Sequence, residues 1–443
     1  MIRVHAVGGF SEVGKNMIAI EVDEDAFIFD EGFFLPAIVS YQEKERVMTE
    51  GKLKEKGAIP DDSVLDKIRH KVRAQFISHA HLDHVGAVQF ISDKYDAPIY
   101  ASPFTIKVLE SLLKDNDAVL KNKAYAIKPN TTFYVQGKSR KYKIDFIYVT
   151  HSTIECLMIA VHTPSGVIVF SGDFKLDDTP VMGPKTNYKR LGELGREGVL
   201  LLITDALYSS SERKTPSERV ARVLLEEVFN TIQNKNSGII VTTFSSHIAR
   251  LKSITEFGKK LGRNVVFLGR SLDKYCSAAR DVNSAPFLGS VNMAKYRRQV
   301  EKTLKTAEKN RKDYLIVCTG HQGEPGSILE RISRHQLPFK IGKEDNIVFS
   351  SSVIPTEVNK EQFAKMESHL KKSHPRIFRD AHVSGHGGKE DLRELIHLLK
   401  PQHILPCHGE SAKTEPAGIL AKELGYKFGK QFHLMKNGEV LEL

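Results

Sequence analysis

The stretch Ser78-His79-Ala80-His81-Leu82-Asp83-His84 decides how this 443-residue sequence folds. It follows the apolar run Ala74-Gln75-Phe76-Ile77, which predicts a buried strand. It precedes Val85-Gly86-Ala87-Val88-Gln89-Phe90-Ile91, which predicts the start of a helix. A histidine-rich loop therefore lies between a strand and a helix, which is where functional sites are usually built. This position disfavours the alternative, a surface turn that happens to be rich in histidine.

The polar side chains of this loop suit a metal site. In an extended segment, residues two apart share a face, so His79 and His81 can point at one ion. Asp83 and His84 lie in the turn that opens the helix and can point at a second ion. Zinc binds imidazole and carboxylate ligands tetrahedrally and often keeps one position for water, so we expect zinc here.

Further ligand-type residues follow later apolar runs. His151 and Asp173 each come directly after a predicted strand, and Asp30 and Asp205 end two others. Alone, each would be an ordinary loop residue, but together with the first cluster His151 and Asp173 are predicted metal ligands.

Two histidines near the end of the chain lie beside glycines. Residues 381–388 predict a strand running into a glycine turn that carries His386, and His408 ends the strand predicted at 403–407. In a chain that already carries a metal motif, this placement favours a functional role over a structural one.

Composition favours a soluble globular protein. The apolar fraction is 41% and the charged fraction is 27%, both ordinary for that class. The sequence contains no run of 18 apolar residues and no signal peptide at its start, so we expect neither a membrane span nor secretion. The net charge of +11 favours a polyanionic partner.

The cysteines indicate a reducing compartment. They lie far apart and without a CxxC spacing, so buried free thiols in the cytoplasm are favoured over a disulfide or a cysteine-bound metal. These cysteines are Cys156, Cys276, Cys318 and Cys407.

The middle of the chain alternates short apolar strands with helices from Thr215 onward. Thr215-Pro216-Ser217-Glu218 predicts a capping box with Pro216 as the first helical residue. This alternation predicts a separate α/β domain with a parallel sheet covered by helices. Its helix over residues 295–312 is strongly basic; a solvated face is the default interpretation and an RNA-tracking stripe the alternative. Residues 39–73 form a charged insertion to which we assign no chemistry.

In this order, the motifs resemble the β-CASP group of the metallo-β-lactamase superfamily, and within it the ribonuclease J family. The resemblance covers nearly the whole chain and rests on the cluster at 79–84 and on the motifs at 8–17, 151, 173, 205, 243–246, 269–271, 319–325, 350–352, 382–386 and 406–410. It implies the compact archaeal type, because the chain ends where bacterial members carry a further domain. The insertion at 39–73 has no counterpart that we can place.

The resemblance implies an α/β fold in three segments. Residues 1–205 and 359–443 would form a metallo-β-lactamase αββα sandwich, and residues 206–358 would form the inserted β-CASP domain with its parallel sheet. RNA would thread through a cleft between the two domains.

The resemblance also implies two zinc ions, with Mn²⁺ or Mg²⁺ as alternatives. Asp173 would bridge them, and Asp30 would support the ligands from behind. The first ion would be held by His79, His81 and His151, and the second by Asp83, His84 and His408.

Asp83, Asp205 and His386 are the predicted catalytic residues. Asp205 and His386 match β-CASP motifs A and B, and His386, oriented by Asp205, is the candidate general acid for the leaving 3′ oxygen. His408 matches motif C, which DNA-repair relatives usually lack, so it favours RNA as the substrate.

The resemblance implies a 5′-to-3′ exonuclease, and endonuclease action also stays open. The substrate would be single-stranded RNA that bears a 5′ monophosphate, and the protein could form a homodimer. Candidate phosphate donors are hydroxyls and imidazoles in loops, each of which alone is more often a turn former or helix cap. They are Ser245, Ser246, His247, Ser351, Ser352, His382 and Ser384.

Four other functions stay open. A thioester hydrolase of the glyoxalase II type shares the zinc motif but does not need the α/β insertion or His386. A β-CASP DNA nuclease and an mRNA 3′-end-type endoribonuclease are alternatives within the group. A pair of substrates that differ only in ribose or deoxyribose would distinguish the DNA nuclease from a ribonuclease. A non-catalytic RNA-binding scaffold is disfavoured, because such scaffolds lose metal ligands and none is missing here.

Overall fold

The computed structural model describes residues 1–443 except 43–47, 233, 235 and 355, and it also leaves out the side chains of 39–42. The chain divides into two compact units. The first unit comprises Met1–Asp178, Gly183–Thr215 and Ser384–Leu443, and the second comprises Thr179–Met182 and Pro216–Val383. The chain passes from the first unit to the second after residue 215 and returns to the first after residue 383. The sequence predicts these two boundaries after residues 205 and 358.

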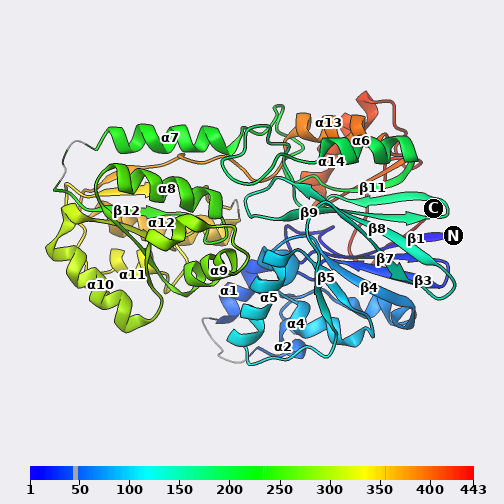
Figure 1. Ribbon diagram of the computed structural model, residues 1–443, viewed down its shortest axis with the longest axis horizontal. Helices are drawn as coiled ribbons and strands as arrows, with labels where there is room; N and C mark the ends of the chain where they lie inside the picture. Colours follow the sequence, from blue (N-terminus) through cyan, green and yellow to red (C-terminus); the bar gives the residue numbers. More distant parts are fainter. Residues whose placement is uncertain (43–47, 233, 235, 355) are drawn as a thin grey trace. The chain divides into compact units, whose positions relative to one another are not determined.

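The first unit contains two sheets (Figure 1). In spatial order, the seven-stranded sheet is β19 (Val440–Glu442), β1 (Ile2–Gly8), β2 (Met17–Val22), β3 (Asp25–Phe29), β4 (Val72–Ile77), β5 (Ile99–Ala101) and β6 (Ala124–Ala126). The six-stranded sheet is β18 (His403–Cys407), β11 (Val199–Asp205), β10 (Gly166–Phe170), β9 (Cys156–Thr163), β8 (Lys141–Val149) and β7 (Thr131–Gln136).

Helices cover the outer faces of these sheets. Over the six-stranded sheet lie α6 (Tyr188–Glu197), α13 (Lys389–Leu399) and α14 (Ser411–Glu423). The elements beside the seven-stranded sheet are α1 (Leu35–Gln42), α2 (Glu50–Glu55), η1 (Asp62–Leu65), η2 (Arg69–Lys71), α3 (Leu82–Val85), α4 (Val88–Ile91), η3 (Ser92–Lys94) and α5 (Pro103–Asp115).

Alternation along the strands builds this sandwich. Phe27 and Phe29 of β3 pack into the core shared by the two sheets, whereas Ala26 and Ile28 face the helices on the outer side. Successive side chains of a strand point to opposite faces, so an all-apolar strand is buried on both. The predicted αββα arrangement is therefore confirmed.

The charged insertion is held to the first unit by Asp62, whose side chain is fully buried. Its carboxylate accepts hydrogen bonds from Lys54 Nζ at 2.5 Å, Lys94 Nζ at 2.9 Å and the Tyr95 hydroxyl at 2.9 Å. Residues 43–47 of the insertion lie outside the described residues.

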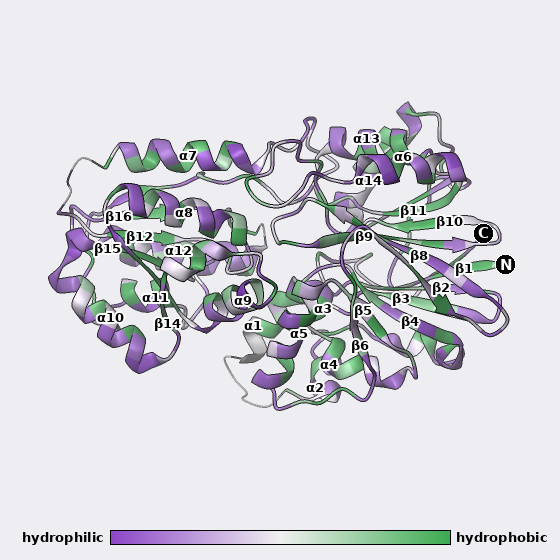
Figure 2. Cartoon of the chain, in the orientation of Figure 1, coloured by the Kyte–Doolittle hydropathy of each residue, from purple (hydrophilic) through white to green (hydrophobic). Residues whose placement is uncertain are grey.

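The second unit is a six-stranded parallel sheet with helices, as predicted. Its spatial order is β14 (Asn292–Ala294), β13 (Asn264–Leu268), β15 (Tyr314–Cys318), β12 (Ile239–Thr242), β16 (Asn346–Phe349) and β17 (Arg376–Phe378). The helical elements are α7 (Glu218–Asn230), α8 (Ile248–Lys260), α9 (Arg270–Asp281), η4 (Pro286–Ser290), α10 (Arg297–Lys309), η5 (Arg311–Asp313), α11 (Ile328–Ser333) and α12 (Glu357–Lys371). In Figure 2 the strands are largely hydrophobic and α10 is largely hydrophilic.

Two local predictions are wrong. Residues 381–384 are not a strand; the strand is the shorter β17, which pairs with β16 and places residues 376–378 in the second unit. Helix α7 begins at Glu218 with Ser217 as its N-cap, because the Ser217 side chain accepts from Arg219 N. Pro216 therefore precedes the cap and is not the first helical residue.

All four cysteines are free and buried, as the sequence predicts. Within the described part of the chain, no helix combines the length and the apolar character needed to cross a bilayer.

Candidate metal centre

The candidate ligands of the first unit all follow strands. His79 and His81 lie in the loop after β4, and His81 is the N-cap of α3, which carries Asp83 and His84. His151, Asp173 and His408 come within three residues of the ends of β8, β10 and β18. Strands that end at one edge of a sandwich bring together residues far apart in the sequence.

The structure brings these residues into two groups that share Asp173. Within each group, one potential ligand atom per residue lies within 4.8 Å of the others. The first group is His79, His81, His151 and Asp173, and the second is Asp83, His84, Asp173 and His408.

The spacing of the imidazole nitrogens fits a bound cation. His81 Nδ1 lies 3.1 Å from His79 Nε2 and 3.1 Å from His151 Nε2. Nitrogens bound to a tetrahedral zinc ion at about 2.0–2.1 Å would stand about 3.3 Å apart. Three imidazole nitrogens that converge in this way would be stabilised by a shared positive ion, so the donor set fits zinc.

Asp173 lies at the centre of the cluster. Its Oδ2 is 3.2 Å from His84 Nε2, 3.6 Å from His79 Nε2 and 3.7 Å from His151 Nε2. Its Oδ1 is 3.7 Å from His408 Nδ1. One carboxylate therefore faces imidazoles of both groups, the arrangement expected of a bridging ligand.

Asp30 fixes two of these histidines from behind. His84 Nδ1 donates to Asp30 Oδ2 at 2.7 Å, which turns His84 Nε2 towards the cluster. Ser78 donates to both Asp30 oxygens, from its backbone N at 2.7 Å and its Oγ at 2.8 Å, and its Oγ contacts His79 Nδ1 at 2.9 Å. Such partners set the tautomer and orientation of metal-binding histidines.

Asn16 contacts candidate metal ligands, and no role was predicted for it from the sequence. Its side-chain amide donates to the carbonyl oxygen of Asp83 at 3.0 Å, and its Oδ1 accepts from His408 Nδ1 at 3.0 Å. It therefore links α3 to the loop after β18. The signal available in the sequence was its place within the glycine-flanked motif at 8–17.

Burial sets the protonation of the first group. It lowers the pKa of His79 and of His151 well below the usual value and the pKa of His81 to about 4. Burial acts in the same direction on His84, but the carboxylates of Asp173, Asp30 and Asp83 outweigh it and raise the pKa of His84 well above the usual value. The imidazoles of the first group are thus neutral and can offer lone pairs.

Next to the cluster lies a histidine–carboxylate pair. His386 Nδ1 donates to Asp205 Oδ2 at 2.8 Å, and the His386 ring stacks on His408 with centroids 5.4 Å apart. Burial lowers the pKa of His386, but Asp205 and Asp173 outweigh it and raise that pKa to about 9. Asp205 therefore favours the protonated ring and holds it in one orientation.

The candidate phosphate donors lie mainly in the second unit, at the carboxyl ends of its parallel strands. Ser245, Ser246 and His247 follow β12, Ser351 and Ser352 follow β16, and His382 follows β17. Ser384 belongs to the first unit, where its Oγ accepts from the backbone N of His386 at 3.0 Å.

Two of these candidates, His247 and His382, contact a buried ion pair. Arg250 is fully buried and donates from Nε and Nη2 to the two carboxylate oxygens of Glu218, at 2.6 and 2.8 Å. Its Nη1 lies 3.3 Å from His382 Nδ1, and His247 Nε2 lies 3.3 Å from a Glu218 oxygen. His247 and His382 therefore have structural partners in the second unit.

His321 is a second residue that the sequence analysis left unassigned, although it lies in the quoted motif at 319–325. Its side chain is buried after β15 against the Phe244 ring, with centroids 4.1 Å apart. Neither ring nitrogen has a hydrogen-bond partner among the described residues, and the same holds for the Ser351 hydroxyl. Buried polar groups of this kind usually mark a place for a ligand or water.

Models of three families match successive parts of the chain. The metallo-β-lactamase superfamily matches residues 11–225, the β-CASP domain of ribonuclease J matches 236–368, and the RNA specificity domain of Zn-dependent metallo-hydrolases matches 374–428.

Similar proteins span the whole chain. The ribonuclease J of Methanocaldococcus jannaschii is 39% identical, with 99% of this chain and 98% of that protein covered. The ribonuclease J of Pyrococcus abyssi is 40% identical, with 100% and 97% covered. Ribonuclease J 1 of Streptococcus pyogenes is 32% identical over 100% of this chain and 74% of its own length. A solved structure of a protein of unknown function from Enterococcus faecalis V583 shares the fold, with a TM-score of 0.65, 17% identity and full coverage of both chains.

Proposed function

Because the chain belongs to the ribonuclease J family of β-CASP metallo-β-lactamase proteins, we propose that it is a metal-dependent ribonuclease that acts mainly as a 5′-to-3′ exonuclease. The observation that carries this proposal is the cluster of His and Asp side chains around Asp173, with the Asp205–His386 pair beside it. The cluster suits phosphodiester hydrolysis, and the family and its RNA specificity domain favour RNA as the substrate.

Two zinc ions are the cofactors that we propose. His79, His81 and His151 would hold one, Asp83, His84 and His408 the other, and Asp173 would contact both. Ions bound there would supply Lewis acidity, which lowers the pKa of water towards neutrality and stabilises negative charge on phosphate oxygens. Asp30 and Asn16 would hold the ligand side chains in place through the hydrogen bonds described above.

His386 is the proposed general acid. Hydrolysis that gives a product with a 5′ phosphate breaks the bond between phosphorus and the 3′ oxygen of the preceding nucleotide. That oxygen must then gain a proton. Because Asp205 holds the Nδ1 proton of His386, the proton available for donation is on Nε2. The Asp205 carboxylate raises the pKa of His386 and so favours the protonated form that a general acid requires.

The 5′ phosphate would bind in the second unit, at the carboxyl ends of its parallel strands. Ser245, Ser246 and Ser351 offer hydroxyls there, and His321 is buried without a described hydrogen-bond partner. Ligands of open α/β sheets usually bind at this edge. His247 and His382 would orient the loops through Glu218 and Arg250.

A cytoplasmic location is also part of the proposal, supported by four buried free thiols, which persist in a reducing compartment. Homodimer formation rests on the family resemblance alone.

The test uses one RNA labelled at its 5′ end, carrying either a monophosphate or a hydroxyl, together with the matching DNA. It is incubated with the chain and with a His81→Ala variant. We expect labelled mononucleotide from the monophosphate RNA, little from the hydroxyl form and none from the variant.

Internal fragments from both RNA forms would mean an endonuclease and would remove the role of the phosphate pocket. Equal cleavage of the DNA would contradict the assignment to RNA. No cleavage by the metal-loaded chain would overturn the proposed function.

A further inference from the structure

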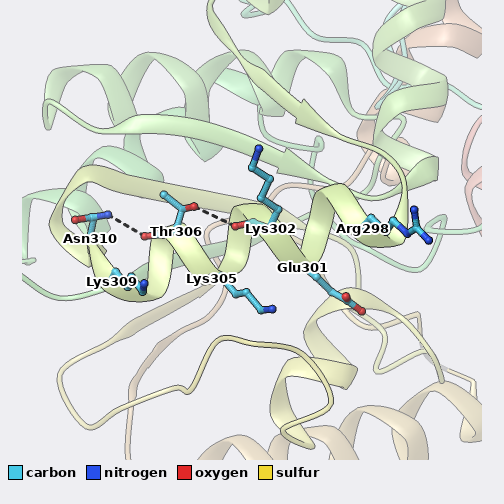
Figure 3. A pocket seen from close by; sticks show the side chains of 7 residues that line it. All are labelled: Arg298, Glu301, Lys302, Lys305, Thr306, Lys309 and Asn310. Carbon is cyan, nitrogen blue, oxygen red and sulfur yellow. Dashed lines mark hydrogen bonds between the residues drawn. The ribbon is translucent and has the colours of Figure 1, made fainter.

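A groove of about 350 Å³ runs along helix α10 in the second unit. The side chains that line it come from this helix and the residue after it (Figure 3). They are Arg298, Glu301, Lys302, Lys305, Thr306, Lys309 and Asn310.

Four cations share one side of the helix. Arg298, Lys302, Lys305 and Lys309 are spaced by four, three and four residues, which places them on neighbouring turns, and all four are exposed. Within the described part of the chain, none of them has a carboxylate oxygen within 4 Å, whereas Glu301, the acid of the groove, pairs with Arg297 at 2.8 Å. We call these four residues the α10 stripe.

The charge of this segment is unusual for the chain. Residues 295–312 contain eight lysines and arginines against two glutamates, a net charge of +6 beside +11 for the whole chain. Helix α12 in the same unit carries three lysines and three glutamates, and two of its lysines, Lys360 and Lys371, pair with a glutamate three or four residues away. A solvated helix usually shows the α12 pattern, so the unpaired α10 stripe calls for an external anion.

An exposed aromatic ring lies at the start of the stripe. Tyr296, the N-cap of α10, is 59% exposed, and Lys295 Nζ lies 5.4 Å from the centre of its ring. A basic track with an aromatic ring beside it is the usual design for binding single-stranded nucleic acid, because bases stack on the ring while cations follow the phosphates.

We propose that the α10 stripe and Tyr296 form an accessory binding surface for single-stranded RNA, which holds the substrate at a place other than the hydrolytic centre. The stripe extends about 16 Å from Arg298 to Lys309, at about 1.5 Å per helical residue. Neighbouring cations are about 5 Å apart, less than the screening length of about 8 Å at physiological salt, so their potentials add. As a role in handling substrate, this surface rests on the proposed ribonuclease function.

The experiment compares two full-length variants in the His81→Ala background, in which the RNA stays intact. The stripe variant carries Arg298→Gln, Lys302→Gln, Lys305→Gln and Lys309→Gln. The control removes the same charge from or beside α12, with Lys360→Gln, Lys365→Gln, Lys371→Gln and Lys372→Gln. Binding of a 20-nucleotide single-stranded RNA is followed by fluorescence anisotropy between 50 and 300 mM salt.

We expect the stripe variant to lose affinity by about ten- to a hundred-fold at 150 mM salt. The slope of log affinity against log salt should become shallower by about 2.8, which is about 0.7 for each of four phosphate contacts. Tyr296→Leu should cost about five-fold or more in affinity with the salt slope unchanged. Circular dichroism checks that each variant is folded; if the stripe variant is not, the pair Lys302→Gln and Lys305→Gln replaces it, with half the change in slope.

Unchanged affinity and slope would overturn the proposal, and so would an equal loss in the α12 control. Loss of binding to phosphatidylserine vesicles with RNA binding intact would assign the stripe to a membrane instead. In a background with His81 restored, the stripe variant should keep wild-type turnover on a five-nucleotide RNA and show a raised KM on the long one. A wild-type chain that binds RNA through the stripe without cutting it would overturn the proposed function and leave this surface standing.

Discussion

Two largely buried polar centres, one in each unit, differ in how their charges are balanced. In the second unit, the Arg250 guanidinium is matched by the Glu218 carboxylate and by the Ser350 and Ala381 carbonyl oxygens. In the first unit, His81 Nδ1 lies 3.1 Å from both His79 Nε2 and His151 Nε2, so three imidazole nitrogens converge. Burial shifts pKa values in both, so burial alone does not identify a site.

The balance of hydrogen-bond donors and acceptors separates the roles of the two centres. A network closed on itself, such as Arg250 with Glu218, stabilises the fold. A set of converging nitrogens, such as those around His81 Nδ1, would be stabilised by a bound positive ion.

The largest effect should come from removing a ligand of the first group. His81→Ala should lower ribonuclease activity by about 10³-fold or more, because a lost ligand removes the bound ion and its Lewis acidity. Metal content and RNA hydrolysis would be measured together. The matched control is His403→Ala, whose ring pairs with His433 outside the cluster; it should keep full metal content, and a comparable loss of activity there would contradict the distinction.

Removing Arg250 should reduce stability instead of chemistry. Arg250→Met removes both Arg250 hydrogen bonds from the buried Glu218 carboxylate, which costs about 3–5 kcal/mol of unfolding free energy. The double variant Arg250→Met with Glu218→Leu should lose less. Denaturant unfolding measures both, and metal content should stay at the wild-type level. A single variant that is more stable than the double would show that the pair is not closed on itself.

These centres also mark what the sequence could predict. The seven candidate ligands could be named in advance, because each follows an apolar strand and their order in the chain matches a known motif. The contacts of Asn16 and Arg250 could not, because they join residues far apart in the chain: Asn16 reaches His408 across 392 positions. Likewise, the short edge strands β14 and β17 have only three residues each, too few for a hydrophobic pattern to identify them.

A smaller effect should follow from replacing Asp30, which hydrogen-bonds to the candidate ligand His84 from behind. Asp30→Asn keeps the size of the side chain but removes the charge that accepts from His84 and Ser78. Metal affinity should fall by about 10- to 100-fold, the usual cost of losing such a partner. Titration with a competing chelator measures it. Asp145→Asn, whose carboxylate pairs with His162 and Arg190, serves as the control and should leave metal affinity unchanged; a loss of equal size there would refute the role given to Asp30.

The smallest effect is a change in the free energy of unfolding at acidic pH. Burial raises the pKa of Glu218, but Arg250 and His247 outweigh it and hold that pKa well below the usual value. Its folded pKa is thus below its unfolded one, so its contribution is complete above about pH 4.5 and is lost as the pH falls through the folded value. The stability difference between wild type and Glu218→Gln should be constant from pH 5 to 7 and shrink at lower pH, by at most about 1.4 kcal/mol per pH unit. Unfolding curves at pH 3–7 would show it; a difference that grows on acidification has the wrong sign.

We propose that one buried carboxylate, Asp173, joins two metal sites, and metal counting by mass spectrometry measures how many ions are bound. The wild-type chain should contain two ions, His151→Ala and His408→Ala one each, and Asp173→Ala fewer than either. A wild-type chain that holds a single ion, unchanged by His408→Ala, would rule out a second site joined by Asp173.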